Sequence, residues 1–336
     1  MRLALDAMGG DDAPAAMVQG AIDYARACPT HCVVLVGRES DIRTAIAAEG
    51  GAPANVDIEH APEVIGMADK IDALKEKPDD SMNRCAQLVK QGKADAMVLC
   101  GNTGCSVASA QLHLRRVPGI KRAAILTPLP KPTGHTWVID CGANAVGKPE
   151  QLVQFAEMTA LFLQAAYGKP RPKIGVLSIG EEDEKGNELT HETLKLLRAT
   201  ALNVVGNVEG HHLYNTDVDI VVCDGFTGNI VLKTSEGVEA ALRTIIKEEV
   251  EKRFWARIGY LLMKPAFAGV KRRVDWRQVG GCPLLGVDGI TIIGHGRSNR
   301  LAVFHALRQA AHCVDTKVME TLRARFRTLA AVHATE

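Results

Sequence analysis

The sequence predicts a three-layer α/β/α sandwich built around a mainly parallel sheet. Strand and helix patterns alternate from the first residues onward, which is typical of a parallel sheet with helices on both faces. In addition, five strand patterns run directly into short loops rich in Gly, Asn and Asp. These loops are 8–11, 101–104, 141–144, 180–183 and 224–229, after strand patterns 3–5, 96–99, 137–140, 174–177 and 220–222.

These loops indicate the kind of ligand that the fold holds. Each loop leads into a helical pattern at once or within a few residues, so we expect several helix N-termini to line one crevice. Ligands of open α/β sheets bind outside the carboxyl ends of the strands. The free N–H groups at helix N-termini attract anions, phosphate above all. The sequence therefore predicts an anionic ligand.

The individual elements of the first half follow from local signals. Helices begin after a capping side chain and often end before a glycine, and Ser81 and Gly92 fit these roles around one helix. No linker or internal repeat interrupts the chain, so we expect a single domain over residues 1–336. The expected elements are helix 16–26, strand 32–36 ending at Gly37, helix 41–48, strand 56–58, helix 81–91, strand 94–99 and helix 107–114.

An amphipathic segment over residues 238–278 departs from this alternation. Its apolar residues recur at three- and four-residue spacing, which predicts one long helix from Gly237 to Lys264. After Pro265 come apolar residues 266–268. A basic amphipathic helix with an apolar tip is able to contact a membrane surface, and packing in the core or at a dimer interface is the alternative. The basic residues of the segment are Arg243, Lys247, Lys252, Arg253, Arg257, Lys271, Arg272 and Arg273.

The bulk composition excludes several classes of protein. A formal net charge of +1 over 336 residues argues against a nucleic-acid-binding protein, which would carry a basic excess. No stretch reaches the ~20 apolar residues of a membrane span. Asp6, Asp11 and Asp12 stand where a signal peptide needs an apolar core, and nine cysteines without CxxC pairs fit a reducing compartment. We therefore expect a cytoplasmic protein.

Two glycine motifs resemble nucleotide-binding loops without completing them. Residues 142–148 have P-loop spacing, but Pro149 replaces the Ser or Thr that holds magnesium. Pro149 fits better in the first turn of a helix over 150–162. Residues 294–298 open like a dinucleotide fingerprint but lack its third glycine. This turn offers His295, Arg297 and Ser298 to an anion, and the alternative for His295 is a satisfied turn residue.

Nucleophilic chemistry has weak support in the sequence. Cys105 stands at an expected helix start, where a thiol pKa can fall, but no activating His or Asp accompanies it and inert packing is the alternative. His211 and His212 lie in a polar turn. No Gly-x-Ser-x-Gly elbow or HExxH motif is present. Lys185 is a lone cation in the acidic run 181–188, and it could face an anion only if the acids pair or face away.

Taken together, in this order and spacing, the loops resemble those of the bacterial phosphate acyltransferases of phospholipid synthesis, the PlsX family. The resemblance covers nearly the whole chain, and four positions depart from the family pattern, namely Asp12, Cys105, His211 and Arg297. The matching segments are 5–11 (LDAMGGD), 81–82, 101–104 (GNTG), 118–120, 140–144, 148–150, 179–183, 185–189, 206–210, 224–229, 280–281 and 284–287.

The resemblance implies an enzyme that moves a fatty acyl group from acyl carrier protein to inorganic phosphate. The acyl phosphate product would pass to a membrane glycerol-3-phosphate acyltransferase. The resemblance also implies a homodimer with an isocitrate-dehydrogenase-like fold, peripheral at the inner face of the membrane, without a cofactor or metal. The alternatives are an NAD-dependent dehydrogenase of related fold, a non-enzymatic scaffold between fatty-acid synthesis and the membrane, and a magnesium-dependent P-loop kinase.

The implied reaction needs no protein nucleophile, because phosphate itself attacks the thioester while the protein positions it and stabilises the oxyanion. We therefore expect Lys185, Asn229 and Asn102 to be catalytic. The expected phosphate or substrate ligands are Gly9, Gly10, Asp11, Gly101, Thr103, Gly104, Asn144, Gly228, His295 and Ser298. The expected contacts with carrier protein or membrane are Arg253, Arg257, Leu261, Phe267, Lys271, Arg272 and Arg273.

Overall fold

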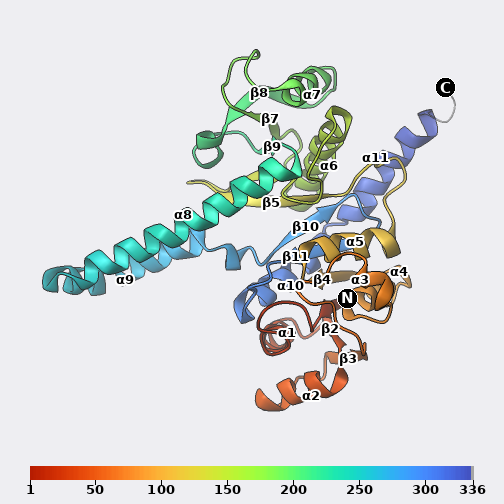
Figure 1. Cartoon of the computed structure of the whole chain (residues 1–336), viewed down its shortest axis with the longest axis vertical. Coiled ribbons are helices and arrows are strands. Elements are labelled where there is room, and N and C mark those ends of the chain that lie inside the picture. Colours follow the sequence, from red (N-terminus) through yellow and green to blue (C-terminus); the bar gives the residue numbers. More distant parts are fainter. Residues whose placement is uncertain (334–336) are drawn as a thin grey trace.

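One continuous sheet crosses the molecule in this computed structural model, which describes residues 1–333 (Figure 1). Within those residues eleven strands follow the spatial order β3-β2-β1-β4-β11-β10-β5-β6-β9-β7-β8. The strands are β1 (Arg2–Asp6), β2 (Cys32–Gly37), β3 (Val56–His60), β4 (Ala96–Leu99), β5 (Ala124–Pro130), β6 (His135–Ile139), β7 (Lys173–Ser178), β8 (Asn203–Glu209), β9 (Ile220–Val222), β10 (Gly281–Leu285) and β11 (Ile290–Gly294).

The sheet consists of two parallel sets that run in opposite directions. Strands β3, β2, β1, β4 and β11 are parallel to one another, and so are β6, β9, β7 and β8. Strands β10 and β5 join the sets through three antiparallel pairings. The mainly parallel sheet is thus confirmed. Because the two sets run in opposite directions, the loops after β1 and β4 follow the strand ends of one set, and the loops after β6, β7 and β9 follow those of the other.

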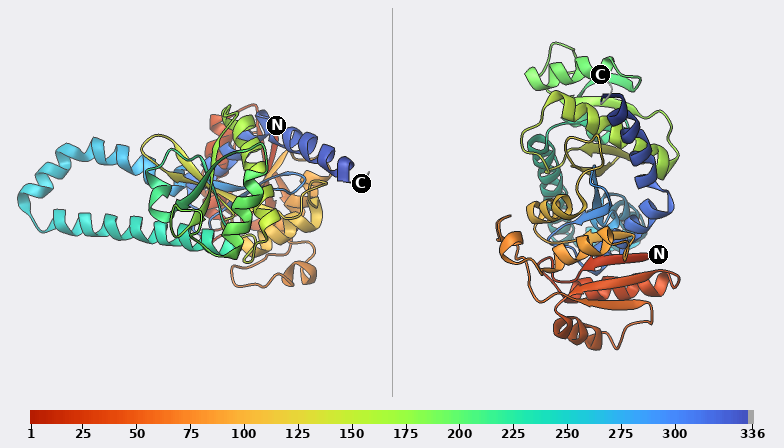
Figure 2. Two further views of the ribbon diagram at one scale, coloured as in Figure 1. Left: turned by 90° about the horizontal axis from the view of Figure 1, so that it is seen from above. Right: turned by 90° about the vertical axis from the view of Figure 1, so that its right-hand side faces the viewer.

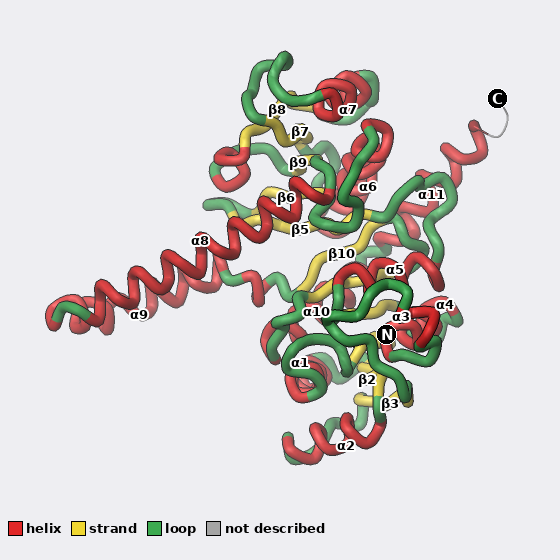
Figure 3. The backbone as a smooth tube through the Cα atoms, in the orientation of Figure 1, coloured by secondary structure: helices red, strands yellow, loops and turns green. Residues whose placement is uncertain are grey.

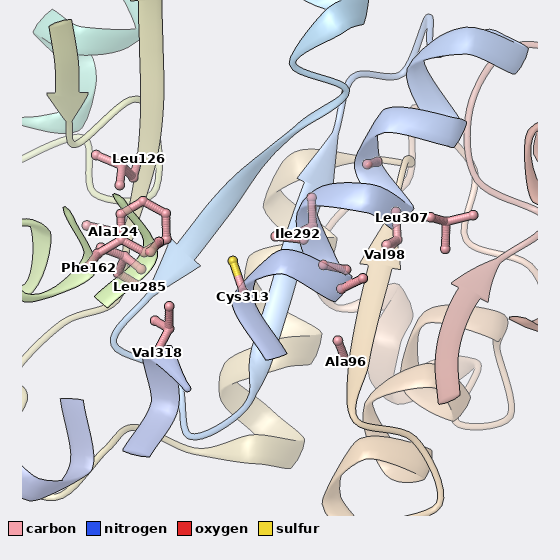
Figure 4. Close-up of a cluster of buried hydrophobic side chains, with 14 of the residues drawn as sticks. Ala96, Val98, Ala124, Leu126, Phe162, Leu285, Ile292, Leu307, Cys313 and Val318 are labelled. Atoms are coloured by element: carbon pink, nitrogen blue, oxygen red, sulfur yellow. The ribbon is translucent and has the colours of Figure 1, made fainter. Parts of the chain in front are cut away.

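Helices cover both faces, which confirms the three layers. Successive strand residues alternate between two cores: Leu3 and Leu5 face the core under α1, α6, α10 and α11, whereas Ala4 faces the core under α4 and α5. Figure 4 shows part of the first core, where Phe162, Leu307 and Val318 converge on the sheet. The helices are α1 (Ala15–Ala27), α2 (Glu39–Ala48), α3 (Ala73–Glu76), α4 (Ser81–Lys90), α5 (Thr103–Leu114), α6 (Pro149–Tyr167), α7 (Glu188–Arg198), α8 (Gly225–Glu251), α9 (Phe254–Val274), α10 (Arg300–Asp315) and α11 (Val318–His333), with short 3₁₀ turns at Gly210–Tyr214 and Trp276–Gln278.

The starts of two helices differ from the sequence prediction. The N-cap of α4 is Asp80 rather than Ser81, because the Asp80 carboxylate accepts the N–H groups of Met82 and Asn83 at 2.7 and 3.1 Å. Helix α5 begins at Thr103 rather than at residue 107, since the Asn102 side chain caps it by accepting the Cys105 N–H at 3.1 Å. Pro149 occupies the first turn of α6, as predicted.

Helices α8 and α9 form a hairpin that projects away from the sheet (Figures 2 and 3). The predicted single helix from Gly237 to Lys264 is wrong: α8 starts earlier, at Gly225, and the chain turns at Lys252 and Arg253. Pro265 lies inside α9. The apolar tip is therefore at Phe254 and Trp255, not at residues 266–268. Among residues 1–333, no helix combines the length and apolar character that crossing a bilayer requires.

Candidate active site

The loops after β1, β4 and β11 lie against one another at one edge of the sheet. The Asp11 N–H donates to the Gly296 carbonyl at 2.8 Å. A Cβ placed on Gly9 would lie 2.9 Å from the Gly101 nitrogen, and Gly10 has a φ of +101° that favours glycine. The predicted ligands Gly9, Gly10, Asp11 and Gly101 therefore belong to one close-packed backbone cluster.

The buried carboxylate of Asp6 packs against the glycine loop after β1. Asp6 is fully buried at the end of β1 and accepts the Met8 N–H at 3.0 Å. Burial raises the pKa of Asp6, although hydrogen bonds from Ser81, Met8 and Gly9 oppose the rise. A Cβ on Gly9 would lie 2.4 Å from the Asp6 carboxylate. Glycine is thus needed here to let the loop approach the strand end.

A second buried carboxylate shapes the loop after β6. The Asp140 carboxylate accepts the backbone N–H groups of Ile125, Ala143 and Asn144 at 2.9, 3.0 and 2.7 Å. Burial raises the pKa of Asp140, and these hydrogen bonds oppose the rise. At Gly142 the loop takes a φ of +125°. The sequence analysis assigned Asp140 no role, although an acidic residue ending an apolar strand is a usable signal.

Helix α8 connects the two loop clusters. Asp224 caps its start by accepting the Thr227 N–H at 2.8 Å. Asn229 then lies over Gly142, where a Cβ on the glycine would be 3.7 Å from the amide oxygen of Asn229. One turn later, Lys233 Nζ lies 3.0 Å from His295 Nε2 in the loop after β11. Residues four apart share a helix face, so this face of α8 reaches from one cluster to the other. The sequence analysis missed Lys233.

The three candidate asparagines differ in how their amides are used. The Asn102 amide donates to the carbonyls of Met67 and Asp69 at 3.0 and 2.9 Å. The Asn144 amide donates to the Ala123 carbonyl at 2.7 Å and to Asp140 at 2.9 Å. In the part of the chain that the structure describes, the exposed Asn229 amide makes no hydrogen bond. Of the three, Asn229 has the amide that is free for a ligand.

Lys185 lies in the loop after β7, where two of the neighbouring acids are paired. Asp183 pairs with Arg198 at 2.7 Å and Glu181 with His212 at 3.0 Å. Over residues 1–333 the Lys185 ammonium forms no ion pair or hydrogen bond. Because β7 and β9 are adjacent and parallel, this loop leaves the same edge of the sheet as the α8 start, although no hydrogen bond joins Lys185 to Asn229.

Four other predicted ligands lie at helix starts or in a buried turn. Thr103 and Gly104 form the first turn of α5. Ser298 is fully buried, and its hydroxyl would be 3.3 Å from a Cβ on Gly294. A Cβ on Gly228 would lie 2.0 Å from the Asp140 carbonyl oxygen, so this glycine allows α8 to start directly against β6.

Cys105 is fully buried at the start of α5. Burial raises the pKa of its thiol, which is the opposite of the change that activates a nucleophile. The favoured interpretation of this residue is therefore inert packing.

The predicted carrier or membrane contacts do not form one patch. Arg253 and Arg257 lie at the hairpin tip, whereas Lys271, Arg272 and Arg273 end α9 near the sheet. Residues 257 and 271 are about 21 Å apart along the helix, at about 1.5 Å per residue. Leu261 is 68% exposed, while the ring of Phe267 packs on Tyr260 with centroids 5.0 Å apart.

Sequence comparison places the chain among known proteins. The profile of a family described as "Fatty acid synthesis protein" matches residues 1–321. The chain is 44% identical over 311 residues to "Phosphate acyltransferase" of Geotalea daltonii, covering 92% of this chain and 90% of that protein. It is 43% identical over 325 residues to "Phosphate acyltransferase" of Desulfitobacterium hafniense strain Y51, covering 96% of each.

Solved structures with low sequence identity share the fold. A phosphotransacetylase from Streptococcus pyogenes superposes with a TM-score of 0.62 at 16% identity, covering 95% of this chain and 94% of that chain. A 4-hydroxythreonine-4-phosphate dehydrogenase from Klebsiella pneumoniae gives a TM-score of 0.56 at 14% identity, covering 94% and 99%. These likenesses agree with the predicted fold class and concern the fold alone.

Proposed function

This chain belongs to the phosphate acyltransferase family, and we propose that it transfers a fatty acyl group from acyl carrier protein to inorganic phosphate. It is an acyltransferase that acts in lipid synthesis, and the carrier-bound donor and the route of the reaction are the proposed part. The observation that supports them most is the free amide of Asn229 over the loop of Gly142, one turn from the ammonium of Lys233. Neutral and positive donors at one place suit a phosphate and a developing oxyanion.

The proposed reaction is a direct attack. A phosphate oxygen bonds to the thioester carbonyl carbon, and the carbonyl oxygen becomes an oxyanion. The tetrahedral intermediate then collapses, the carbon–sulfur bond breaks, and the thiolate of the carrier leaves and gains a proton, which balances the proton that hydrogen phosphate gives up. The products are an acyl phosphate and the free thiol of the carrier. Each atom is supplied by the two substrates, so no covalent acyl-enzyme is needed.

In this reaction Asn229 donates a hydrogen bond to the oxyanion, and backbone N–H groups of the loops after β1 and β4 hold phosphate. Lys185 supplies a positive charge from the loop after β7. Holding phosphate against the carbonyl is worth up to about 7–11 kcal/mol of the barrier. One oxyanion donor contributes about 2.7–4 kcal/mol. The amides of Asn102 and Asn144 already donate hydrogen bonds to backbone carbonyls, so these two residues shape their loops.

The hairpin of α8 and α9 supports the proposed partners. Phe254 and Trp255 at its tip are 69% and 79% exposed, and Arg253 and Arg257 lie beside them. Apolar side chains flanked by cations suit the surface of an anionic membrane. We propose further, from the family resemblance, a homodimer at the inner face of the membrane, whose product passes to the glycerol-3-phosphate acyltransferase. The acidic carrier protein would bind the basic residues 271–273 at the hairpin base.

The assay that tests this function is thiol release from palmitoyl-acyl carrier protein without added metal, with hydroxylamine to trap acyl phosphate. Thiol release and trapped product that both require phosphate are expected. Thiol release that does not depend on phosphate would indicate a thioesterase and would contradict the proposal. An absence of release together with an NADH fluorescence titration that saturates would indicate a dehydrogenase instead.

A further inference from the structure

A cluster of basic residues surrounds one carboxylate where α8 meets the loop after β11. We propose that Lys233 and His295 together bind the phosphate substrate, and that Glu236 is the positioning residue that holds them in place. This inference rests on the proposed function, because it assigns the substrate anion of that reaction to a defined pair of side chains. The backbone N–H groups of the glycine loops after β1 and β4 would then complete the phosphate site.

The contacts within the cluster are short and mutual. Lys233 Nζ lies 3.0 Å from His295 Nε2 and 3.1 Å from a carboxylate oxygen of Glu236. The same Glu236 oxygen lies 3.6 Å from His295 Nε2 and 3.4 Å from the Arg297 guanidinium. Glu236 is thus the shared partner of three basic side chains that come from two separate elements.

The cluster has more hydrogen-bond donors than acceptors. His295 Nδ1 accepts the backbone N–H of Arg297 at 3.1 Å, so the proton of the neutral imidazole belongs on Nε2 and points toward Lys233. A lysine ammonium carries three donors and no acceptor. Within residues 1–333, Glu236 is the carboxylate paired with each of Lys233, His295 and Arg297. An anion with several acceptor oxygens that binds beside Lys233 and His295 would accept hydrogen bonds from the remaining donors.

The carboxylate is suited to a positioning role. The Glu236 side chain is 15% exposed. Burial acts to raise its pKa, but hydrogen bonds from His295 and Lys233 outweigh that effect and hold the pKa below its usual value. The Glu236 carboxylate is therefore ionised at neutral pH. On the other side of His295, the Trp276 ring packs with its centroid 5.1 Å from the imidazole.

The position of the cluster fits the substrate of the proposed reaction. Lys233 follows Asn229 by one turn on the same face of α8, and Asn229 covers Gly142. On the other side, Gly296 next to His295 accepts the Asp11 N–H. A phosphate held by Lys233 and His295 would thus lie between the free amide of Asn229 and the glycine cluster after β1.

The test is steady-state kinetics of Lys233→Gln, Lys233→Arg and Glu236→Gln, with KM for phosphate and KM for the acyl donor measured separately. Calorimetric titration with inorganic phosphate, without donor, gives a second readout. Lys247→Gln is the matched control, because it removes the same charge from the same helix about 21 Å further along, at about 1.5 Å per residue. Lys247 is exposed and pairs with Glu251 at 3.8 Å.

We expect Lys233→Gln to raise KM and Kd for phosphate about ten- to a hundredfold, the loss of a charge-assisted hydrogen bond, with KM for the donor unchanged. Lys233→Arg should restore part of this affinity. Glu236→Gln should lower kcat several-fold and raise KM for phosphate much less than Lys233→Gln does, because it frees the Lys233 side chain but also removes a repelling charge. Lys247→Gln should match the wild type.

Two results would overturn the inference: a KM for phosphate in Lys233→Gln within twofold of the wild type, or a rise in this KM in Glu236→Gln as large as in Lys233→Gln. The proposed function fails separately. If the wild-type protein binds phosphate through Lys233 but forms no acyl phosphate, the binding site stands and the reaction is wrong. If acyl phosphate forms and Lys233→Gln leaves phosphate affinity intact, the reaction stands and this site is wrong.

Discussion

Asn229 differs from the other loop asparagines in having an amide without a partner among residues 1–333. We expect Asn229→Ala to lower kcat about 10²–10³-fold, the effect of removing one oxyanion donor. Its free energy of unfolding should stay near that of the wild type, because the side chain is exposed and no hydrogen bond is lost. The measurements are acyl phosphate formation and urea unfolding. Full turnover in Asn229→Ala would contradict the assignment.

Asn144→Ala is the matched comparison for that variant. In the wild-type protein, the Asn144 amide donates to the Ala123 carbonyl and to the buried Asp140 carboxylate. Leaving such buried groups unpaired costs about 1–3 kcal/mol. This variant should therefore lose stability first, and any loss of activity should follow from the disturbed loop. Equal stability of the two variants would mean that the hydrogen bonds do not distinguish them.

Asp80, the N-cap of α4, should make stability depend on pH. Burial raises its pKa from 3.8 to about 6, so the folded state holds its proton more tightly than the unfolded state does. The free energy of unfolding should therefore fall as pH rises from about 4 to about 6, in total by about 3 kcal/mol at about 1.4 kcal/mol per pKa unit. Asp80→Asn keeps an acceptor for Met82 and Asn83 but does not titrate.

The check on Asp80 is urea unfolding of both proteins at pH 4, 5, 6 and 7. The curve of stability against pH should be flatter over this window for Asp80→Asn than for the wild type. Parallel curves would show that the Asp80 carboxyl does not titrate as its surroundings imply.

At the scale of elements, the start of α8 depends on a glycine. A Cβ at Gly228 would lie 2.0 Å from the Asp140 carbonyl oxygen, and backbone cannot move aside cheaply. We expect Gly228→Ala to cost about 1–3 kcal/mol or more through overpacking. Gly237 on the same helix has open space around it, so Gly237→Ala should stabilise the protein by about 0.5–1 kcal/mol. Thermal or urea unfolding of both variants would show opposite signs, and a stabilising effect in both would contradict this packing.

The hairpin tip should determine membrane binding. Trp255 is 79% exposed at the turn between α8 and α9, and a charge there opposes insertion into the interface. Trp255→Asp should abolish flotation with anionic vesicles, whereas Leu112→Asp, at an exposed apolar position on α5, should not. Flotation that survives Trp255→Asp would show that the tip is not the membrane contact.

The hairpin also shows what local sequence patterns could and could not predict. The apolar spacing indicated helix correctly on both sides of Lys252, but the same spacing continues through the turn, so it did not indicate where the chain reverses. The sequence predicted the start of α5 four residues too late for a related reason. Asn102 caps that helix through a hydrogen bond to Cys105, and the glycine next to it favoured a longer loop.

At the scale of the whole molecule, alternation of strands and helices predicted the layers and the mainly parallel sheet. It could not predict that the two parallel sets run in opposite directions. That reversal depends on pairings such as Leu285 with Ala124, residues far apart in the chain that carry no local signal. The predicted site residues therefore fall into two clusters, and Lys233, which links them, was visible only once α8 was placed across the sheet.

The central claim is that phosphate attacks the acyl-carrier thioester directly. The most direct measurement is the exchange of labelled acyl carrier protein into unlabelled palmitoyl-acyl carrier protein, with phosphate removed. Direct attack predicts no exchange until phosphate is added, and acyl phosphate formation when it is. Rapid exchange without phosphate would reveal an acyl-enzyme and would contradict the account.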